Sequence, residues 1–320
     1  METLILSGEE VERLLDIERV MEVVEEAFSA YAKNEAEMPP KSYIYYPKGD
    51  LRTMPAYLKY NETSGVKIVN VHTGNVDLPT VMAILELIDP NTGFPLAIMD
   101  ATRITAYRTG AAGGIAIKYL SRDDSKTIGL VGAGVQARTQ LLAALKIREM
   151  ENVFVYDIRK EASLEFQKFA QELGLNTRVC SGISEVTENC DVLITATPVR
   201  RPIVNSVSPG THINAIGADA PGKQEINPDI IKRAKIVIDD WEQACHSGEI
   251  NVPLSKGILK KEDIYGTLGE ICAGIKEGRV NDDEITLFDS TGLAIQDVST
   301  GYFIYKEAVK RNIGQWIKFV

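Results

Sequence analysis

The chain has 320 residues, of which 44% are hydrophobic and 25% are charged, so it can bury the cores of about two ordinary globular domains. Its 45 acidic side chains outnumber the 35 basic ones, and a formal net charge of −10 argues against non-specific binding to nucleic acid or anionic membranes. Four scattered cysteines without a C-x-x-C pair, and three histidines without metal-ligand spacing, predict neither a disulfide framework nor a metal site.

The first third of the chain predicts a mixed α+β arrangement. Its opening residues, METLILSGEE, carry acids where a signal peptide carries bases, and no run reaches the length of a membrane span, so we expect a cytoplasmic protein. Apolar residues recur at helical spacing between Val20 and Tyr31, which predicts an amphipathic helix over residues 18–33 that ends at MPPK. Short turns such as PKGD and DPNTG separate the next runs, which predict antiparallel strands: KSYIYY, LRTMPAYL, GVKIVNV, TVMAILELID and FPLAIMD. Residues 102–120 predict a closely packing helix rich in alanine and glycine.

From Ser125 the pattern changes to strands alternating with helices. Two helical patterns, VQARTQLLAALKIR and EASLEFQKFAQEL, lie between apolar runs, which is typical of a parallel, doubly wound sheet. The predicted strands are KTIGLVG, VFVYD, CDVLITAT, THINAIG, AKIVIDD and EITLFDS. The last apolar residues, from Ala294 to Val309, predict an amphipathic helix that need not belong to this sheet.

A glycine fingerprint stands where the first of these strands meets its helix. Gly132, Gly134 and Ala137 form G-x-G-x-x-A, in which the first glycine permits a tight turn and the second lets a pyrophosphate approach the backbone. The free N–H groups at the start of the helix would bind the phosphates. Asp157 ends the next strand and can accept hydrogen bonds from the adenosine ribose, which favours NAD over NADP, although Arg159 is close enough to pair with a 2′-phosphate. The alternative is an ordinary glycine turn beside an exposed acid.

Small residues end two later strands. They are Thr195, Ala196 and Thr197 in one strand, and Ile216, Gly217 and Ala218 in the other. Because ligands of open α/β sheets bind at the carboxyl ends of strands, we expect these residues to leave room for the nicotinamide half of the cofactor. Asp219, directly after the second strand, could take a proton or orient water, or it could simply cap its loop.

Several cations in the first third could bind or transform a substrate. Lys67 lies in an apolar run whose alternation places Lys67 and Val69 on one face of the strand. If Lys67 is buried, its pKa should fall, which would let it act as an acid or base. The alternative is a lysine solvated at a sheet edge, as most strand lysines are. Arg52 and Arg108 could bind anions or could form ordinary salt bridges. Lys41, after two prolines, is unremarkable by itself.

Taken together, ordered blocks over nearly the whole chain resemble the ornithine cyclodeaminase/mu-crystallin family, and most closely its archaeal-type alanine dehydrogenase branch. The blocks are MPPK, GDLRTMPA, GVKIVN, TGFPLAIMDAT, RTGAAGGIAIKYL, GAGVQA, THINAIGADAPGKQE, GEI and FDSTGLAIQD. The resemblance implies an α/β fold in which a Rossmann domain (residues 119–296) is inserted into an α+β substrate and dimerisation domain (residues 1–118 plus 297–320). It implies homodimers that pair through the first domain.

The resemblance also implies roles for individual residues. Lys67 and Asp219 would be the catalytic pair at the nicotinamide, and Lys41 and Arg108 would hold the substrate carboxylate with Arg52 nearby. Cofactor positions would be Arg108, Thr109, Gly132, Gly134, Val135, Gln136, Asp157, the two strand ends named above, and Ser290, Gly292 and Leu293.

Two departures from the family pattern bear on the substrate. Ornithine cyclodeaminases carry a glutamate just before Met-Pro for the distal amine, and this chain has Thr53 there, which favours a short neutral amino acid. The family usually has arginine where Lys41 stands, and lysine cannot form the planar fork. We therefore expect an NAD-dependent dehydrogenase that converts L-alanine to pyruvate and ammonia. Ornithine cyclodeaminase, an imine or ketimine reductase, and a crystallin-like NAD(P)H-binding protein remain alternatives.

Overall fold

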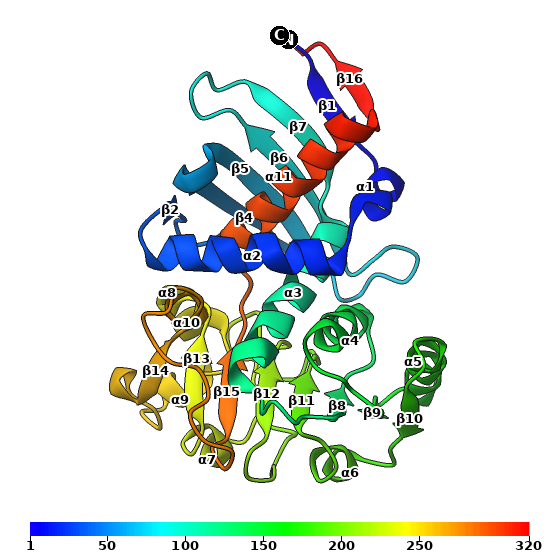
Figure 1. Cartoon of the computed structure of the whole chain (residues 1–320), viewed down its shortest axis with the longest axis vertical. Coiled ribbons are helices and arrows are strands. Elements are labelled where there is room, and N and C mark those ends of the chain that lie inside the picture. Colours follow the sequence, from blue (N-terminus) through cyan, green and yellow to red (C-terminus); the bar gives the residue numbers. More distant parts are fainter. Residues whose placement is uncertain (320) are drawn as a thin grey trace. The chain divides into compact units, whose positions relative to one another are not determined.

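The computed structural model describes residues 1–319 and divides into two compact units, each with its own sheet (Figure 1). Unit 1 comprises Met1–Arg108 and Leu293–Val320, and unit 2 comprises Thr109–Gly292. Unit 2 is thus inserted into unit 1 in the sequence. The boundaries fall at 108/109 and 292/293, whereas the expected boundaries are 118/119 and 296/297. The first observed boundary lies inside helix α3 (Thr102–Leu120).

Unit 1 contains a largely antiparallel sheet in the order β16-β1-β7-β6-β5-β4-β2, and β3 also pairs with β4. The five apolar runs of the first third all form strands, as predicted, and they pair antiparallel in succession. The strands are β1 (Thr3–Leu6), β2 (Ala36–Glu37), β3 (Ser42–Tyr46), β4 (Gly49–Leu58), β5 (Thr63–Val71), β6 (Val81–Ile88), β7 (Pro95–Asp100) and β16 (Gln315–Ile317).

Two long helices cover one face of this sheet. They are α2 (Ile17–Ala32) and α11 (Ala294–Arg311), and α11 packs against α2 and against β4, β5 and β6. α2 begins one residue before the predicted position because the Asp16 carboxylate caps it, accepting a hydrogen bond from the Arg19 N–H at 3.0 Å. The short helices α1 (Gly8–Leu14) and η1 (Lys59–Asn61) complete the unit. The final helix therefore belongs to unit 1 and not to the Rossmann sheet, as predicted.

Unit 2 contains a sheet in the order β10-β9-β8-β11-β12-β15-β13-β14, in which every neighbouring pair is parallel. The strands are β8 (Thr127–Val131), β9 (Asn152–Tyr156), β10 (Asn176–Val179), β11 (Val192–Thr195), β12 (His212–Ala215), β13 (Lys235–Ile238), β14 (Ile264–Thr267) and β15 (Thr286–Asp289). The order reverses between β8 and β11, so the carboxyl ends of these two strands form the switch point at which such sheets bind ligands.

Helices and apolar clusters lie on both faces of the unit 2 sheet, which explains why its strands read as continuous apolar runs. The helices are α4 (Val135–Ile147), α5 (Lys160–Glu172), α6 (Ile183–Thr187), α7 (Pro228–Ile231), α8 (Trp241–Ser247), α9 (Asn251–Ser255), η2 (Lys261–Asp263) and α10 (Leu268–Cys272). Gly110 of α3 shows why that helix is rich in small residues: a Cβ there would lie 2.6 Å from the Thr139 carbonyl oxygen of α4.

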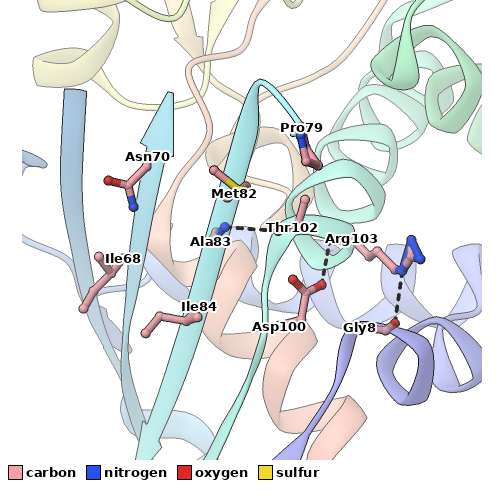
Figure 2. Close-up of a pocket in the computed structure, with 10 residues that line it drawn as sticks. All are labelled: Gly8, Ile68, Asn70, Pro79, Met82, Ala83, Ile84, Asp100, Thr102 and Arg103. Carbon is pink, nitrogen blue, oxygen red and sulfur yellow. Dashed lines mark hydrogen bonds between the residues drawn. The ribbon is translucent and has the colours of Figure 1, made fainter. Parts of the chain in front are cut away.

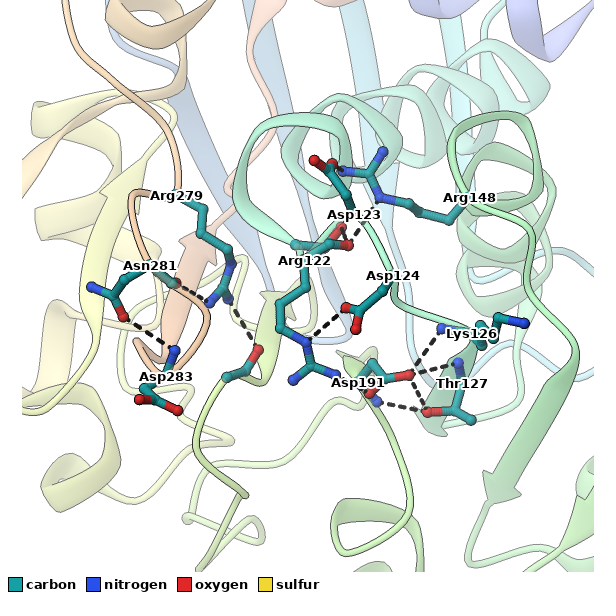
Figure 3. A network of polar contacts seen from close by, with 12 residues as sticks. Arg122, Asp123, Asp124, Lys126, Thr127, Arg148, Asp191, Arg279, Asn281 and Asp283 are labelled. Atoms are coloured by element: carbon teal, nitrogen blue, oxygen red, sulfur yellow. Dashed lines mark hydrogen bonds and ion pairs between the residues drawn. The ribbon is translucent and has the colours of Figure 1, made fainter.

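A polar network closes the amino end of the unit 2 sheet (Figure 3). The Asp191 carboxylate accepts hydrogen bonds from the Thr127 N–H and hydroxyl at 2.9 and 2.7 Å and from the Lys126 N–H at 2.9 Å. Arg122 donates to its other oxygen at 2.6 Å. Asp191 thereby ties the start of β11 to the start of β8. Within residues 1–319, no helix is long and apolar enough to cross a membrane.

Candidate active site

Strand β5 places Lys67 on the covered face of the unit 1 sheet. Lys67 lies opposite Met54 of β4 and Leu85 of β6, and it is 0% exposed. The predicted alternation is confirmed, since Lys67 and Val69 are buried while Ile68 between them faces the other way. The alternative of a solvated edge lysine is wrong, because β5 is an inner strand with a neighbour on each side.

Lys67 shares one carboxylate with Arg108. Its Nζ donates to Oδ1 of Asp297 at 2.7 Å and to the Thr105 hydroxyl at 3.3 Å, and Nε of Arg108 donates to the same Asp297 oxygen at 3.0 Å. Burial, and then the positive charges of Arg108 and Lys41, lower the pKa of Lys67 from 10.5 to about 7, although Asp297 opposes the change. At neutral pH a large fraction of Lys67 is therefore a neutral amine that can accept a proton.

The first turns of α11 place buried polar atoms without hydrogen-bond partners beside Lys67 and Arg108. Oε1 of Gln296 accepts from Nη1 of Arg108 at 2.8 Å. Within residues 1–319, Oδ2 of Asp297, Nε2 of Gln296 and the Thr300 hydroxyl are buried without a hydrogen-bond partner. Buried polar atoms are nearly always satisfied by protein, water or ligand, so this end of α11 can bind the polar groups of a small molecule or ordered water.

Arg52 lies on the same sheet face as Lys67, whereas Thr53 does not. Arg52 precedes Met54 by two residues on β4, and Met54 is the residue opposite Lys67, while Thr53 lies opposite Ile68 on the other face. The expectation that Thr53, standing in place of a glutamate, favours a short neutral amino acid stays a prediction. Arg52 is 6% exposed and donates to both carboxylate oxygens of Asp50, at 2.7 and 3.0 Å.

The far face of the unit 1 sheet carries a separate hollow of about 540 Å³ (Figure 2). Ile68 and Ile84 point into it from neighbouring strands, and none of the predicted site residues lines it. Its lining is completed by Gly8, Asn70, Pro79, Met82, Ala83, Asp100, Thr102 and Arg103. Ile84 is half exposed, so this face is open and partly apolar in the single chain.

In unit 2, the glycine fingerprint forms the expected turn between β8 and α4. Gly132 has φ +97°, and a Cβ there would lie 2.6 Å from the Ala196 carbonyl oxygen, so glycine is required. A Cβ on Gly134 would meet nothing within 4 Å, and no side chain caps α4, whose first residue, Val135, is 67% exposed. This open helix start, with its free N–H groups, fits a dinucleotide diphosphate.

Asp157 follows β9 and lies against the glycine turn. Its Oδ2 accepts a hydrogen bond from the Ala133 N–H at 2.9 Å, and its Oδ1 accepts one from the Arg159 N–H at 2.8 Å. The Arg159 side chain is 74% exposed, with Nε 3.8 Å from Oδ1 of Asp157. An anion thus stands where the ribose of a dinucleotide would bind, which suits NAD, while Arg159 extends into solvent.

The later strand ends converge on one carboxylate that was not among the predicted site residues. Glu225 accepts hydrogen bonds from Thr195, Thr197 and Gly217, at the ends of β11 and β12. Asp219, on the loop between Gly217 and Glu225, is partly exposed and pairs with Lys223. After β15, the Ser290 hydroxyl is buried without a partner in the described residues, and Gly292 has φ +78°.

Within each unit, the structure brings most predicted site residues together. In unit 1, Lys67 and Arg108 meet through Asp297, and in unit 2 the cofactor candidates gather at the carboxyl edge of the sheet. Sequence reasoning missed Asp297 and Glu225. Both lie inside motifs that were recognised, FDSTGLAIQD and GADAPGKQE, but each motif contains a second acid, so its sequence does not mark these two carboxylates.

The sequence profile of the ornithine cyclodeaminase/mu-crystallin family matches residues 1–312. The chain belongs to this family. A full-length relative, the alanine dehydrogenase of Archaeoglobus fulgidus, is 53% identical over 323 residues, which covers 100% of this chain and 99% of the relative.

Two solved structures superpose on all or nearly all of the chain. An archaeal alanine dehydrogenase dimer with bound NAD has a TM-score of 0.97 and 52% identity, and it covers 100% of both chains. The Δ1-pyrroline-2-carboxylate reductase of Thermococcus litoralis, solved with NADH and L-proline, has a TM-score of 0.95 and 39% identity, covering 98% of this chain and 99% of the other.

Proposed function

We propose that the protein is an NAD-dependent alanine dehydrogenase that catalyses reversible oxidative deamination of a small L-amino acid. The carrying observation is Lys67, a fully buried lysine of lowered pKa beside Arg108, in a chain 53% identical over its full length to an alanine dehydrogenase. The fit of the glycine turn and Asp157 to a dinucleotide supports NAD as the cofactor. Gly132, Gly134, Val135 and Gln136 would hold the diphosphate.

The remaining cofactor candidates would complete the nicotinamide side. They are Arg108, Thr109, Thr195, Ala196, Thr197, Ile216, Gly217, Ala218, Ser290, Gly292 and Leu293. Small side chains predominate among these strand-end residues, which leaves space for a flat ring.

The cations of unit 1 would hold the substrate carboxylate. Arg108 donates hydrogen bonds from Nε to Asp297 and from Nη1 to Gln296. These bonds fix the guanidinium, so a carboxylate can approach it in one orientation. Lys41 and Arg52 add positive charge. Because Arg52 is cationic and lies on the Lys67 face, a second ammonium on the substrate is disfavoured there, which supports alanine over ornithine.

Lys67 and Asp219 would move the protons. NAD, when bound, accepts the hydride from the substrate Cα. Neutral Lys67 takes a proton from the substrate ammonium. This deprotonation must come first, because hydride leaves Cα readily only when the amine is neutral. The resulting iminium adds water at Cα, Asp219 accepts a proton from that water, and ammonia then departs. The balanced products from L-alanine, NAD⁺ and water are pyruvate, ammonium, NADH and one proton.

The test is NADH oxidation by pyruvate with ammonium, and NAD⁺ reduction by L-alanine. Both reactions should proceed in the wild type, and Lys67→Met and Asp219→Asn should abolish turnover while NADH still binds. NADH binding without turnover by the wild type would instead indicate a crystallin-like binding protein. Rapid proline formation from ornithine without alanine turnover would indicate a cyclodeaminase.

A reductase of cyclic imines is the second candidate, favoured by the 39% identity to the Δ1-pyrroline-2-carboxylate reductase over nearly the whole chain. Such an enzyme needs no ammonia, because its substrate already contains the C=N bond. Comparing pyruvate plus ammonium with Δ1-pyrroline-2-carboxylate, both with NADH, separates the two functions by their kcat/KM ratio.

We also propose that the protein is a homodimer that pairs through unit 1. The open sheet face around the half-exposed Ile84 supports this surface, because a strand face with exposed apolar side chains is typical of an interface. Light scattering after size exclusion measures the mass, and a monomer at micromolar concentration would contradict the pairing.

All four cysteines are unpaired thiols, which agrees with a cytoplasmic location.

A further inference from the structure

The Glu225 carboxylate is completely buried and joins two strand ends of unit 2. Its Oε2 accepts hydrogen bonds from the Thr195 hydroxyl at 2.8 Å and the Gly217 N–H at 2.9 Å. Its Oε1 accepts from the Thr197 N–H at 2.8 Å and the Thr197 hydroxyl at 2.7 Å. Each oxygen therefore satisfies one backbone N–H and one hydroxyl, and β11 is tied to β12 just beyond where both end.

The backbone of Glu225 is fixed as firmly as its side chain. Its N–H donates to both oxygens of the Glu249 carboxylate, at 2.9 and 3.0 Å. Its carbonyl oxygen accepts hydrogen bonds from the N–H groups of Ile203 at 2.8 Å and Val204 at 3.0 Å. Rotation of the Glu225 side chain away from the strand ends would leave several buried donors unsatisfied, which is costly.

Glu225 also closes the loop that carries Asp219. Gly217 begins the loop and Glu225 ends it, so the bond from the Gly217 N–H to the carboxylate joins the two ends. Asn251 holds the outer part, accepting from the Gly222 N–H at 3.0 Å and donating to the Lys223 carbonyl at 3.0 Å. The position of Asp219 is therefore set by a closed loop whose base is the Glu225 carboxylate.

We propose that Glu225 is a positioning residue for the cofactor and for Asp219, acting through the Thr197 and Gly217 backbone. The proposal rests on the proposed function in one respect, namely that the strand ends receive the nicotinamide half of NAD. Glu225 itself is buried behind those ends and touches neither substrate nor cofactor. Its carboxylate fixes the separation of the two loops before the cofactor arrives.

Glutamine at position 225 cannot reproduce this arrangement. Its single carbonyl oxygen replaces one carboxylate oxygen, and its NH₂ group replaces the other. Whichever way the amide is turned, the NH₂ group faces a backbone N–H, that of Gly217 or that of Thr197, and two donors repel. One of the two strand-end loops must then move, although the change in volume is negligible.

Asp191→Asn is a matched control at the opposite edge of the same sheet. Asp191 also accepts from a threonine N–H and hydroxyl and joins β8 to β11, but at their amino ends (Figure 3). Both variants replace a multiply bonded carboxylate by an amide. Only Glu225 lies where the cofactor is expected, so a loss of stability alone should appear in both variants, whereas a loss of cofactor binding should appear in E225Q only.

The experiment measures NADH affinity by fluorescence titration, KM for NAD⁺ and kcat for alanine, and backbone hydrogen exchange of residues 217–225 without ligand. We expect E225Q to weaken NADH binding about tenfold or more, to raise KM for NAD⁺, to lower kcat and to speed exchange in the loop. D191N should change NADH affinity less than about twofold. Thr197→Val is the second variant, for use if E225Q does not fold. It removes one hydroxyl donor and keeps the backbone N–H, so we expect a smaller effect in the same direction.

Wild-type affinity and exchange in E225Q would overturn the proposal, as would equal weakening of NADH binding in E225Q and D191N. A wild type that binds NADH without converting alanine would refute the proposed reaction alone, because the affinity and exchange measurements would still test Glu225. A wild type that binds no NADH would overturn both.

Discussion

Replacing Lys67 by methionine should make the protein more stable at neutral pH while abolishing its activity. A lysine whose pKa falls from 10.5 in the unfolded chain to about 7 in the fold opposes folding at neutral pH. At about 1.4 kcal/mol for each pH unit, the full penalty is on the order of 5 kcal/mol. Methionine removes it and fills a similar volume, and Asp297 keeps its hydrogen bond from Arg108.

The sign of the pH dependence follows from proton binding. Between pH 7 and 10.5 the unfolded chain holds the Lys67 proton more fully than the folded chain, so wild-type stability rises with pH in that window. Below pH 7 both states are protonated, and the contribution no longer changes. The stability advantage of Lys67→Met should therefore be constant below about pH 6 and shrink by about 2 kcal/mol between pH 7 and 9.

Denaturant unfolding of both proteins at four pH values from 6 to 9 measures this difference, and groups that titrate in both proteins cancel. Lys59→Met is the matched control, because the Lys59 side chain is 41% exposed and pairs with Glu37 at the surface. Its difference from the wild type should not vary with pH over this range. A Lys67→Met difference that is equally flat, or that grows from pH 7 to 9, would refute the buried, low-pKa lysine and with it the role of Lys67 as a base.

Three further outcomes are expected. Gly132→Ala should cost roughly 1–3 kcal/mol of stability and weaken NADH binding, because φ +97° and the Ala196 carbonyl oxygen at 2.6 Å exclude a Cβ. An unchanged melting temperature and an unchanged NADH affinity would contradict this. Asp157→Ser should raise the ratio of kcat/KM for NADP⁺ to that for NAD⁺ by about tenfold or more, since the repulsion of a 2′-phosphate is lost and Arg159 remains; an unchanged ratio would place the ribose elsewhere. Ile84→Glu should halve the mass measured by light scattering, because it puts a charge on the open sheet face; a persistent dimer would exclude that face from the interface.

Local sequence patterns predicted the elements with strong periodicity. Five of the strands of unit 1 (β3, β4, β5, β6 and β7), the glycine turn and the final helix were predicted because each is encoded by local spacing in the sequence. Strands β1, β2, β10, β14 and β16 and the short helices of unit 2 were not predicted, because segments this short carry too little pattern and are stabilised by tertiary pairing.

The candidate site was predictable only in part. Alternation predicted which face Lys67 occupies, but the partner that holds it, Asp297, is 230 residues away in the chain. Burial of a carboxylate depends on donors brought together by the fold, so Glu225 could not be distinguished from a surface acid.

The position of the last strand and helix has a consequence for biosynthesis. β15 is hydrogen-bonded between β12 and β13, and α11 covers β4, β5 and β6, so neither core is closed without residues 286–311. A nascent chain on the ribosome therefore has unpaired strand edges and an uncovered apolar sheet face until residues 286–311 have been translated. Such a chain is exposed to aggregation and to chaperones for most of its synthesis, and removal of residues 286–320 should leave both halves unfolded.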